Sequence, residues 1–596
     1  MRNLKAVVLL LGALSLLLLV VACSGGDEEE TGTASAAAVA PAAEAPVVTK
    51  EEKAPSAAAA AQFEMEPESG MPQYGGTLRL TAGDDPRSLN FLDNVSASTG
   101  STLQGVYDRL VNWKWEGGSN TWKEIAPGIA ASWKVSDNGL TWTFKLREDV
   151  TFHNGAPLTS HDVKATYDHY VGAAKKTIDR RPPAKSYVGP FVDSVDAPDD
   201  YTVVLNLNAP AAVLLQNLSA GWANIVSKKD LDAHGVDWFI DNVNGTGPFK
   251  WMPDEWERGV GFKLERNENY WEDGLPYLDG KEYTVISSRS LIQAAFETGN
   301  IDVISGPSTG ELASITAKFG DKVKLIEGPG GSPAWAMLNT RVEPFNDEKV
   351  RQAVYLYLNR DEIKERALQG APGYLGSWFE TNTFAGGYGT SLDELRKKDI
   401  AYALDKTAAR QKAKEILSAA GYNDLSKYKI DVISRGTSAT AATFLGSQVI
   451  ASQLQEMGFD VEFKALESLA AVEALKKGTG WHATMYTSSL PYPAPEAMLN
   501  RYLSNSGQRN YSGLEDPIID PLVKQITGAT NETDRRARLT ELEEYLSTGK
   551  NAMYFIYYSG VQFLEHDYVH GRRFVSSWFA QYDNRTWVDQ NSPSRN

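Results

Sequence analysis

Hydrophobic and polar positions alternate most regularly between residues 133 and 146. Two runs of strand-forming residues, 133–136 and 140–146, are joined by Asp-Asn-Gly at 137–139. Asn and Gly adopt positive φ at little cost, so this connection predicts a tight hairpin turn. In the second run, polar residues separate three hydrophobic ones, which gives the strand one buried and one solvated face. The three hydrophobic residues are Trp142, Phe144 and Leu146.

A helical pattern follows the hairpin. Thr159 or Ser160 can cap a helix that carries Val163, Tyr167 and Tyr170 on one side. Because these three positions recur at helical spacing, the segment predicts an amphipathic helix directly after the hairpin.

The C-terminal half alternates between helical and strand patterns. An alanine-rich helix is expected to end at Gly421, residues 450–463 predict a helix that runs into a strand, and 535–546 predict a last amphipathic helix before an aromatic strand at 554–558. Helices that alternate with single strands favour a partly parallel α/β lobe. The stretch Gly-Pro-Gly-Gly at 328–331 predicts a crossing between domains, since these residues interrupt regular structure.

The N-terminus has the three parts of a signal peptide at residues 1–22. Arg2 and Lys5 precede an apolar run at 6–21, which is short for a membrane-spanning helix of about 20 residues. The run ends in Val-Val-Ala before Cys23, the single cysteine of the chain. This arrangement resembles the lipobox of bacterial lipoproteins and implies that Cys23 is lipidated; a plain signal peptide with a chance cysteine is the alternative. Residues 23–71 are rich in Ala, Pro and Glu, which predicts a disordered tether.

Composition narrows the classes of function. The chain has 596 residues, 42% of them hydrophobic, and a formal net charge of −17, which argues against nucleic acid as a partner because phosphate recognition needs a basic surface. No H-E-x-x-H or G-x-S-x-G motif occurs, and no cysteine other than Cys23 could act as a nucleophile. We therefore expect no catalytic residues and no cofactor. The histidines at 153, 161 and 169 are spaced like a metal cluster, but ordinary surface or packing roles are the default, so no metal site is expected.

Five motifs stand in order along the globular chain. They are Ala-Ala-Ser-Trp at 130–133, Asp-Asn-Gly-Leu-Thr-Trp-Thr-Phe-Lys-Leu-Arg at 137–147, Phe-His-Asn-Gly at 152–155, Gly-Thr-Gly-Pro-Phe at 245–249 and Leu-Glu-Arg-Asn-Glu-Asn-Tyr-Trp at 264–271. The set resembles the extracellular solute-binding proteins of the peptide/nickel family, the ligand receptors of ABC importers, over about residues 74 to 575. Gly245 and Gly247 also suggest a phosphate loop, but they lack the further glycine and the lysine that a phosphate cradle needs, so a structural turn is expected.

The resemblance implies a periplasmic-binding-protein-like α/β fold: two α/β lobes joined by a hinge, plus a small inserted mixed α/β domain. On that pattern, one lobe is discontinuous. The expected parts are lobe I at 72–115, 221–328 and 550–596, the inserted domain at 116–220, and lobe II at 329–549.

The family resemblance also locates a candidate ligand site. Its members hold the ligand between the lobes and close over it, and peptide binders pair the peptide ammonium with an aspartate a few residues before a Tyr-x-x-Pro. Here Tyr492 and Pro495 are present, but Pro491 occupies the aspartate position and Ser488 the preceding aromatic position. A peptide ammonium would lose a charge-assisted partner, about 1.5–3 kcal/mol. Either another acid compensates, or the ligand is an uncharged oligosaccharide or another small solute. The candidate binding residues, for each of which core packing is the alternative, are Trp335, Trp378, Tyr486, Ser488, Tyr492 and Tyr557.

The sequence thus favours the substrate-binding component of an ABC importer, a monomer that captures a peptide or another small solute such as an oligosaccharide and delivers it to a membrane permease. It would be extracytoplasmic, in the periplasm or at the cell surface, and anchored to the bacterial membrane through Cys23. Two alternatives stay open: an extracellular hydrolase on the same anchor, and a sensory receptor of the same fold.

Overall fold

The structure is a computed structural model, and it describes residues 71–595 with internal gaps. The gaps fall at 87, 93–99, 101, 104, 116–121, 179–182, 187, 380–387, 437–440, 491–493, 506, 508, 573–583 and 593. The signal peptide, Cys23 and the tether lie outside the described residues, as do Pro491 and Tyr492. In the described part of the chain, no helix is both long and apolar enough to span a bilayer.

The predicted hairpin is confirmed. β4 (Ala130–Val135) pairs antiparallel with β5 (Thr141–Leu146), and Gly139 in the turn has a φ of 70°. β6 (Val192–Asp199) and β7 (Thr202–Leu207) complete a four-stranded sheet in the order β4-β5-β7-β6. Phe144 and Leu146 are buried, as the alternation predicts, whereas Trp142 is half-buried. The prediction of a buried face is therefore correct at two of the three positions.

The predicted helix is α2 (Ser160–Ala174), and Thr159 caps it. The Thr159 amide donates to Asp162 Oδ2 at 2.8 Å, which forms one half of a capping box. Val163, Tyr167 and Tyr170 are fully buried, as their spacing predicts. Tyr170 donates its hydroxyl proton to the carbonyl of Asn224 at 3.0 Å, which fixes the helix to the following segment.

A second four-stranded sheet has the order β1-β10-β9-β8. Its strands are β1 (Thr77–Ala82), β8 (Phe249–Glu257), β9 (Gly261–Arg266) and β10 (Gly280–Val285), with β1 parallel to β10 and the other pairs antiparallel. Two short pairs stand beside these sheets: β2 (Val111–Trp115) with β3 (Trp122–Pro127), and β18 (Val569–His570) with β19 (Trp587–Val588).

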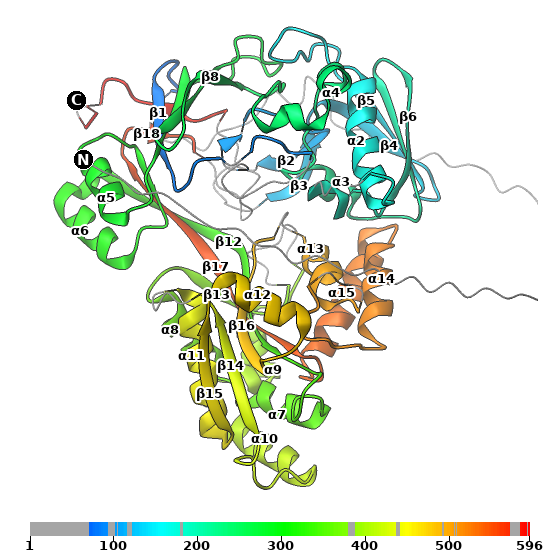
Figure 1. Ribbon diagram of the computed structural model, residues 1–596, viewed down its shortest axis with the longest axis vertical. Helices are drawn as coiled ribbons and strands as arrows, with labels where there is room; N and C mark the ends of the chain where they lie inside the picture. The colour runs from blue at the N-terminus through cyan, green and yellow to red at the C-terminus, as the bar shows by residue number, and fades with distance from the viewer. Residues whose placement is uncertain are drawn as a thin grey trace, which may run out of the picture. The chain divides into compact units, whose positions relative to one another are not determined.

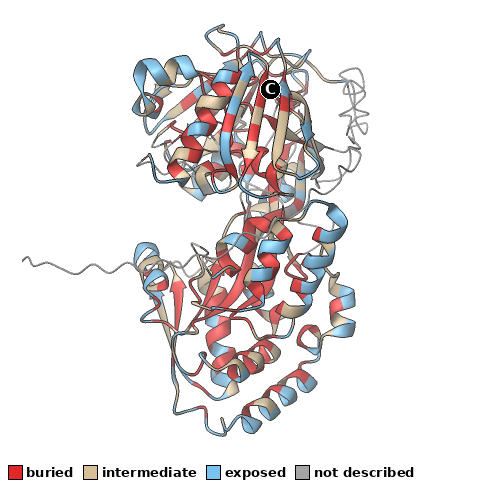
Figure 2. Cartoon of the chain, turned by 90° about the vertical axis from the view of Figure 1, so that its right-hand side faces the viewer, coloured by how far each residue is buried: buried red, intermediate tan, exposed pale blue. Residues whose placement is uncertain are grey.

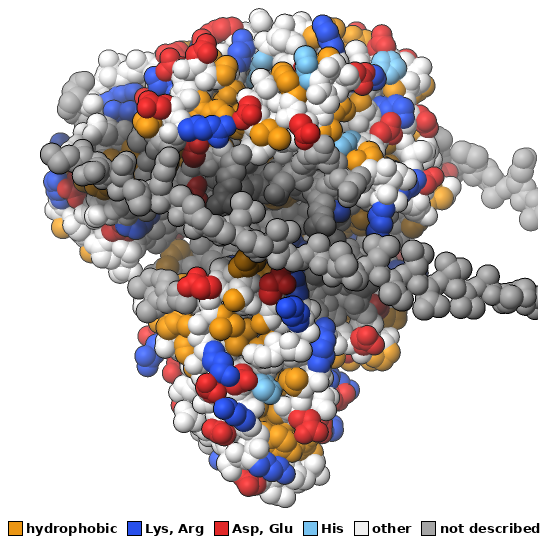
Figure 3. Space-filling view, in the orientation of Figure 1, with side chains coloured by type: hydrophobic (Ala, Val, Ile, Leu, Met, Phe, Trp, Pro, Cys, Tyr) orange, Lys and Arg blue, Asp and Glu red, His pale blue; other side chains and the backbone are white. Residues whose placement is uncertain are grey.

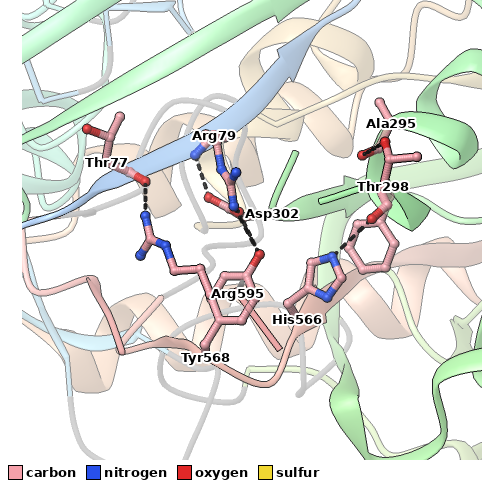
Figure 4. A network of polar contacts seen from close by, with 9 residues as sticks. Thr77, Arg79, Ala295, Thr298, Asp302, His566, Tyr568 and Arg595 are labelled. Carbon is pink, nitrogen blue, oxygen red and sulfur yellow. Dashed lines mark hydrogen bonds and ion pairs between the residues drawn. The ribbon is translucent and has the colours of Figure 1, made fainter. Parts of the chain in front are cut away.

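A buried polar network joins β1 to segments that lie far away in the sequence. Asp302 is fully buried, and its Oδ1 accepts from Arg79 Nη2 at 2.6 Å and from the Tyr568 hydroxyl at 2.8 Å. Figure 4 shows these groups together with Arg595, which donates to the Thr77 carbonyl at 3.2 Å. Residues from both ends of the described chain are therefore held in one network.

The largest sheet has the order β11-β17-β12-β16-β14-β15, with β13 paired to β17 (Figure 1). β14 runs parallel to both β15 and β16, so the predicted partly parallel character is confirmed. The aromatic strand expected at 554–558 is part of a longer strand, β17. The strands are β11 (Val303–Ser305), β12 (Val323–Leu338), β13 (Gly373–Leu375), β14 (Lys429–Arg435), β15 (Asp460–Leu466), β16 (Ala483–Thr487) and β17 (Met553–His566).

The breaker-rich stretch 328–331, predicted as a crossing between domains, lies inside the long strand β12. The pairing of β12 with β17 continues on both sides of it, with a shift in register between Pro329 and Ser332. A Cβ on Gly330 would approach the Ser559 carbonyl oxygen to 2.0 Å, so glycine is required by the close approach of the two strands.

Helices flank these sheets, and Figure 2 shows exposed positions along the outer sides of helices and buried positions along strands.

The helix expected to end at Gly421 is α10, and Gly421 has a φ of 87°. The helix running into a strand is α11 followed by β15, and the last amphipathic helix is α15, which begins three residues earlier than expected. The bounds are α3 (Leu214–Leu218), α4 (Lys228–His234), α5 (Arg289–Glu297), α6 (Thr309–Phe319), α7 (Glu348–Tyr357), α8 (Arg360–Leu368), α9 (Leu392–Lys398), α10 (Thr407–Ala419), α11 (Ala442–Met457), α12 (Ser468–Lys477), α13 (Glu496–Met498), α14 (Ile519–Thr527) and α15 (Glu532–Leu546).

Candidate ligand-binding site

Aromatic side chains gather where β12 and β16 pair. Trp335 stands opposite Tyr486 in the antiparallel register, and their rings are stacked with centroids 6.4 Å apart. Directly opposed residues point to the same face of a sheet, so the pairing itself brings the two rings together. Trp378 and Tyr502 approach Trp335 with centroid distances of 6.0 and 4.9 Å. We call Trp335, Trp378, Tyr486, Tyr502 and Tyr511 the aromatic cluster; Tyr511 lies edge-on to Tyr486 at 5.6 Å.

Arg509 and the hydroxyl groups of Tyr486, Ser488 and Tyr502 form a polar edge on the aromatic cluster. The hydroxyl groups of Tyr486, Ser488 and Tyr502 lie 3.3, 3.1 and 3.1 Å from Arg509 Nη1 and share its two N–H donors. Tyr502 in turn donates to the Ser488 hydroxyl. One guanidinium therefore fixes the orientation of three hydroxyl groups.

The electrostatics of this edge are set by burial and by the arginine. Burial raises the pKa of Tyr486, the neighbouring Tyr502 raises it further, and Arg509 lowers it, with a net upward shift. Burial lowers the pKa of Arg509, but the neighbouring tyrosines outweigh that effect and raise it overall. The edge therefore presents the neutral phenol of Tyr486 and a permanently charged guanidinium.

A second arginine stands at the end of β14. Arg435 is half-buried, and its guanidinium lies 5.7 Å above the ring centroid of Tyr486, within the range of a cation–π contact. β14 and β16 are parallel, so Arg435 and the residues after Thr487 lie at the carboxyl ends of neighbouring strands. Ligands of open α/β sheets bind outside that edge.

The structure brings together four of the six residues expected at the site. Trp335, Trp378 and Tyr486 belong to the aromatic cluster, and the Ser488 hydroxyl lies at its polar edge. Trp335, Trp378 and Tyr486 are at most 4% exposed and form part of one buried hydrophobic core cluster. Tyr557 packs into a different one, which contains Tyr554 and Ile556, and burial raises its pKa. Tyr492 lies outside the described residues.

Sequence reasoning did not identify Arg435, Tyr502, Arg509 or Tyr511. Arg435 is separated from Tyr486 by 51 positions, and their proximity depends on the pairing of β14 with β16. Tyr502, Arg509 and Tyr511 follow Pro495 closely in the sequence, so extending the search for site residues to position 511 would have included them.

The acid closest in sequence to Pro491 is committed elsewhere. Glu496 is 1% exposed, and its carboxylate is ion-paired with Arg535. It is therefore not free to replace the missing aspartate as a partner for a ligand ammonium.

The three histidines have structural contacts. His153 Nε2 lies 3.0 Å from the Gly247 carbonyl, His169 Nε2 lies 3.2 Å from the Leu92 carbonyl, and His161 lies 3.5 Å from Asp200. Over the described part of the chain, no three or more His, Cys, Asp or Glu side chains are placed to share a metal ion. Gly245 and Gly247 form the structural turn, because a Cβ at either would collide with the backbone of residues 105–106.

Comparison with known proteins identifies the class. The family model of the bacterial extracellular solute-binding proteins, family 5 (middle part), matches residues 124–510, and the chain belongs to this family. It is 27% identical to heme-binding protein A of Haemophilus influenzae, in a match that covers 74% of this chain and 79% of that protein. It is 26% identical to the oligopeptide-binding protein AppA of Bacillus subtilis, in a match that covers 82% of this chain and 87% of that protein. The crystal structure of NikA from Brucella suis in complex with Fe(III)-EDTA superposes with a TM-score of 0.71 at 22% identity, covering 86% of this chain and all of that one.

These findings confirm the predicted fold and family. The fold is that of the periplasmic binding proteins, and the protein is the substrate-binding component of an ABC importer.

Proposed function

We propose that the protein is a lipid-anchored receptor that binds its solute reversibly at the aromatic cluster, catalyses no reaction, and releases the solute to a membrane permease. The observation that supports this most is the arrangement of Trp335, Tyr486 and Arg509, in which buried aromatic rings adjoin a fixed row of polar groups. Binding pockets for small molecules combine apolar area with a few placed polar groups in this way.

Several solute classes fit the family. The relatives and structural neighbours carry names that refer to heme, to oligopeptides and to Fe(III)-EDTA, so membership alone leaves the ligand open. Pro491 takes the place of the aspartate that peptide binders use, which favours a ligand without a free ammonium group. A modified peptide, an oligosaccharide or another small solute meets that condition.

The site is tested by binding and turnover measurements on one sample. Purified protein is titrated by calorimetry with panels of peptides and oligosaccharides, and the mixtures are then analysed for products. We expect binding without product, and Tyr486→Leu should weaken it at least about tenfold because it removes both a ring face and a hydroxyl. Tyr74→Leu, at a 57% exposed tyrosine outside the cluster, is the matched control. Product formation would support the hydrolase alternative instead.

The anchor is tested separately. We expect mass spectrometry of protein from a bacterial host to find an acylated N-terminal cysteine, and membrane fractionation to recover the protein with the lipid phase. Cys23→Ala removes the thiol that carries the lipid, so the variant should leave the membrane fraction. Retention of that variant in the membrane would contradict the lipid anchor without affecting the binding proposal.

A further inference from the structure

A short surface segment, residues 397–404, combines exposed aliphatic and exposed basic side chains. Lys397 and Lys398 end α9, and a single turn of 3-10 helix follows them. Ile400, at the start of that turn, is 44% exposed, and Leu404 is 69% exposed. A lone exposed hydrophobic residue is normal at a protein surface. Here two of them lie four positions apart, directly after two lysines, so the segment is a candidate for a contact with a partner.

The two lysines have no partner of their own. Over the residues that the structure describes, the side chains of Lys397 and Lys398 make no hydrogen bond or ion pair. Arg396, one position earlier, is already ion-paired at 2.7 Å with a carboxylate of α8. Asp405 follows the segment, but its carboxylate accepts from the amide and the hydroxyl of Thr407 at 2.9 and 2.7 Å. The segment therefore offers two unpaired positive charges on a chain whose formal net charge is −17.

Two buried cations hold the backbone of the segment from beneath. Arg360 and Lys406 both donate to the Ala401 carbonyl, at 3.1 and 2.8 Å. Arg360 is 1% exposed, and its guanidinium lies 4.5 and 4.6 Å from the ring centroids of Tyr355 and Tyr402. Because these contacts fix the inward side of the turn, the aliphatic residues on either side of it are presented to solvent from a rigid backbone.

This combination suits an anionic lipid surface. An interfacial contact needs apolar side chains that enter the boundary between headgroups and acyl chains, and basic side chains that attract the phosphates. The centre of a protein interface is instead enriched in aromatic residues and arginine and depleted of lysine, and the segment exposes neither of the enriched types. On the face in Figure 3, acidic and basic side chains of the described residues are interspersed, so that face offers no broad basic surface for lipid.

We propose that the 397–404 segment is a membrane contact: its two aliphatic side chains enter the headgroup region of an anionic bilayer while Lys397 and Lys398 bind the phosphate groups. This inference goes beyond the proposed function, because it gives the globular part of the chain its own contact with lipid. It depends neither on the solute nor on a lipid at Cys23. A contact of this size is weak and reversible, so it orients a protein that is already close to the membrane and does not anchor it.

A fluorescent probe on the segment tests the contact directly. Cys23→Ala removes the single cysteine of the full-length chain, and Leu404→Cys then provides one thiol for a polarity-sensitive fluorophore. Vesicles of phosphatidylglycerol mixed with phosphatidylcholine should shift the emission to shorter wavelength. Vesicles of phosphatidylcholine alone should need at least about a tenfold higher lipid concentration for the same shift, because two lysines near an anionic surface each contribute about fivefold.

The control probe occupies a second exposed leucine. Leu469→Cys carries the same fluorophore at a 76% exposed position of α12, and its emission should not respond to either kind of vesicle. Because the fluorophore reports only its own surroundings, attachment of the chain to the vesicle at another point does not produce the shift at position 404.

Variants in the Leu404→Cys protein then locate the effect. Lys397→Gln combined with Lys398→Gln should raise the lipid concentration at half-maximal shift about tenfold or more. Raising the salt concentration should weaken the response of the parent protein more than that of this double variant, since salt screens the attraction. Lys229→Gln, at an exposed lysine of α4, is the matched control and should change nothing. Circular dichroism of each variant controls for folding.

The lipid contact is contradicted if the fluorophore at position 404 does not respond to anionic vesicles, if positions 404 and 469 respond equally, or if the double lysine variant responds like its parent. A response that appears only when the vesicles contain the reconstituted permease would assign the segment to a protein partner and would also overturn the inference. None of these outcomes bears on solute binding, so the proposed function stands or falls by its own experiments.

Discussion

Glu496 and Arg535 form a buried bidentate ion pair. Arg535 Nε lies 2.7 Å from Glu496 Oε1, and its Nη2 lies 2.8 Å from Oε2. Both side chains are almost completely excluded from solvent, so the pair fixes α15 against the short helix α13, which begins directly after Pro495. The same contact commits Glu496, the acid closest in sequence to Pro491, to a structural role.

Removing one partner of this pair should destabilise the protein strongly. Glu496→Gln removes the buried counter-ion of Arg535 and leaves it only the half-exposed Glu532. We expect the free energy of unfolding to fall by about 3–5 kcal/mol. Urea denaturation followed by circular dichroism measures the loss. Glu541→Gln breaks the half-exposed pair with Arg538 and should cost less than about 1 kcal/mol. Similar losses in the two variants would show that the buried pair has no special role.

The turn at Gly247 should not accept a larger residue. A Cβ there would lie 2.3 Å from the Gly105 carbonyl oxygen, so Gly247→Ala should lower the free energy of unfolding by about 1–3 kcal/mol or more through overpacking. Gly310→Ala is the control, because nothing lies within 4 Å of a Cβ at that position of α6. It should be neutral or mildly stabilising, as alanine is the better helix former. Equal stability of the two variants would argue against the close approach.

The capping box of α2 should contribute measurably. Thr159→Ala removes the hydroxyl that takes part in the cap, and we expect a loss of about 0.5–2 kcal/mol in the free energy of unfolding. Thr159→Ser keeps the hydroxyl group and should retain most of the stability. Thermal unfolding of the three proteins at one pH tests this; the prediction is wrong if serine and alanine destabilise equally.

His153 should make stability depend on pH between about 4 and 6.5. Burial lowers the pKa of His153 to about 4 in the folded protein, against the partly opposing effect of its bond to the Gly247 carbonyl; the unfolded value is about 6.5. Between these values the unfolded chain binds the extra proton, so stability is complete above pH 6.5 and is lost as the pH falls towards 4.

His153→Gln removes this titration. The difference in unfolding free energy between wild type and variant, measured by denaturation from pH 4.5 to 7.5, should rise with pH up to about 6.5 and then level off. Taking the difference cancels the carboxylates that titrate in the same range. A difference that stays flat with pH would contradict a depressed pKa for His153.

Local patterns determined much of the fold. The alternation in 140–146, the Asn-Gly turn, the cap at Thr159 and the glycine at 421 all act through neighbours in sequence, so they could be recognised without tertiary contacts. The order of the family motifs identified the class of protein.

Pairing between distant strands decided the rest. The Gly-Pro-Gly-Gly stretch is part of a strand because β17, more than 200 residues later in the sequence, pairs with β12 on both sides of the stretch. Trp335 and Tyr486 meet only through the register of β12 with β16, and Arg435 reaches them only because β14 lies parallel to β16. Sequence alone determined what kind of protein this is, since its signals are local. Which side chains meet at the candidate site depended on contacts between segments that only folding brings together.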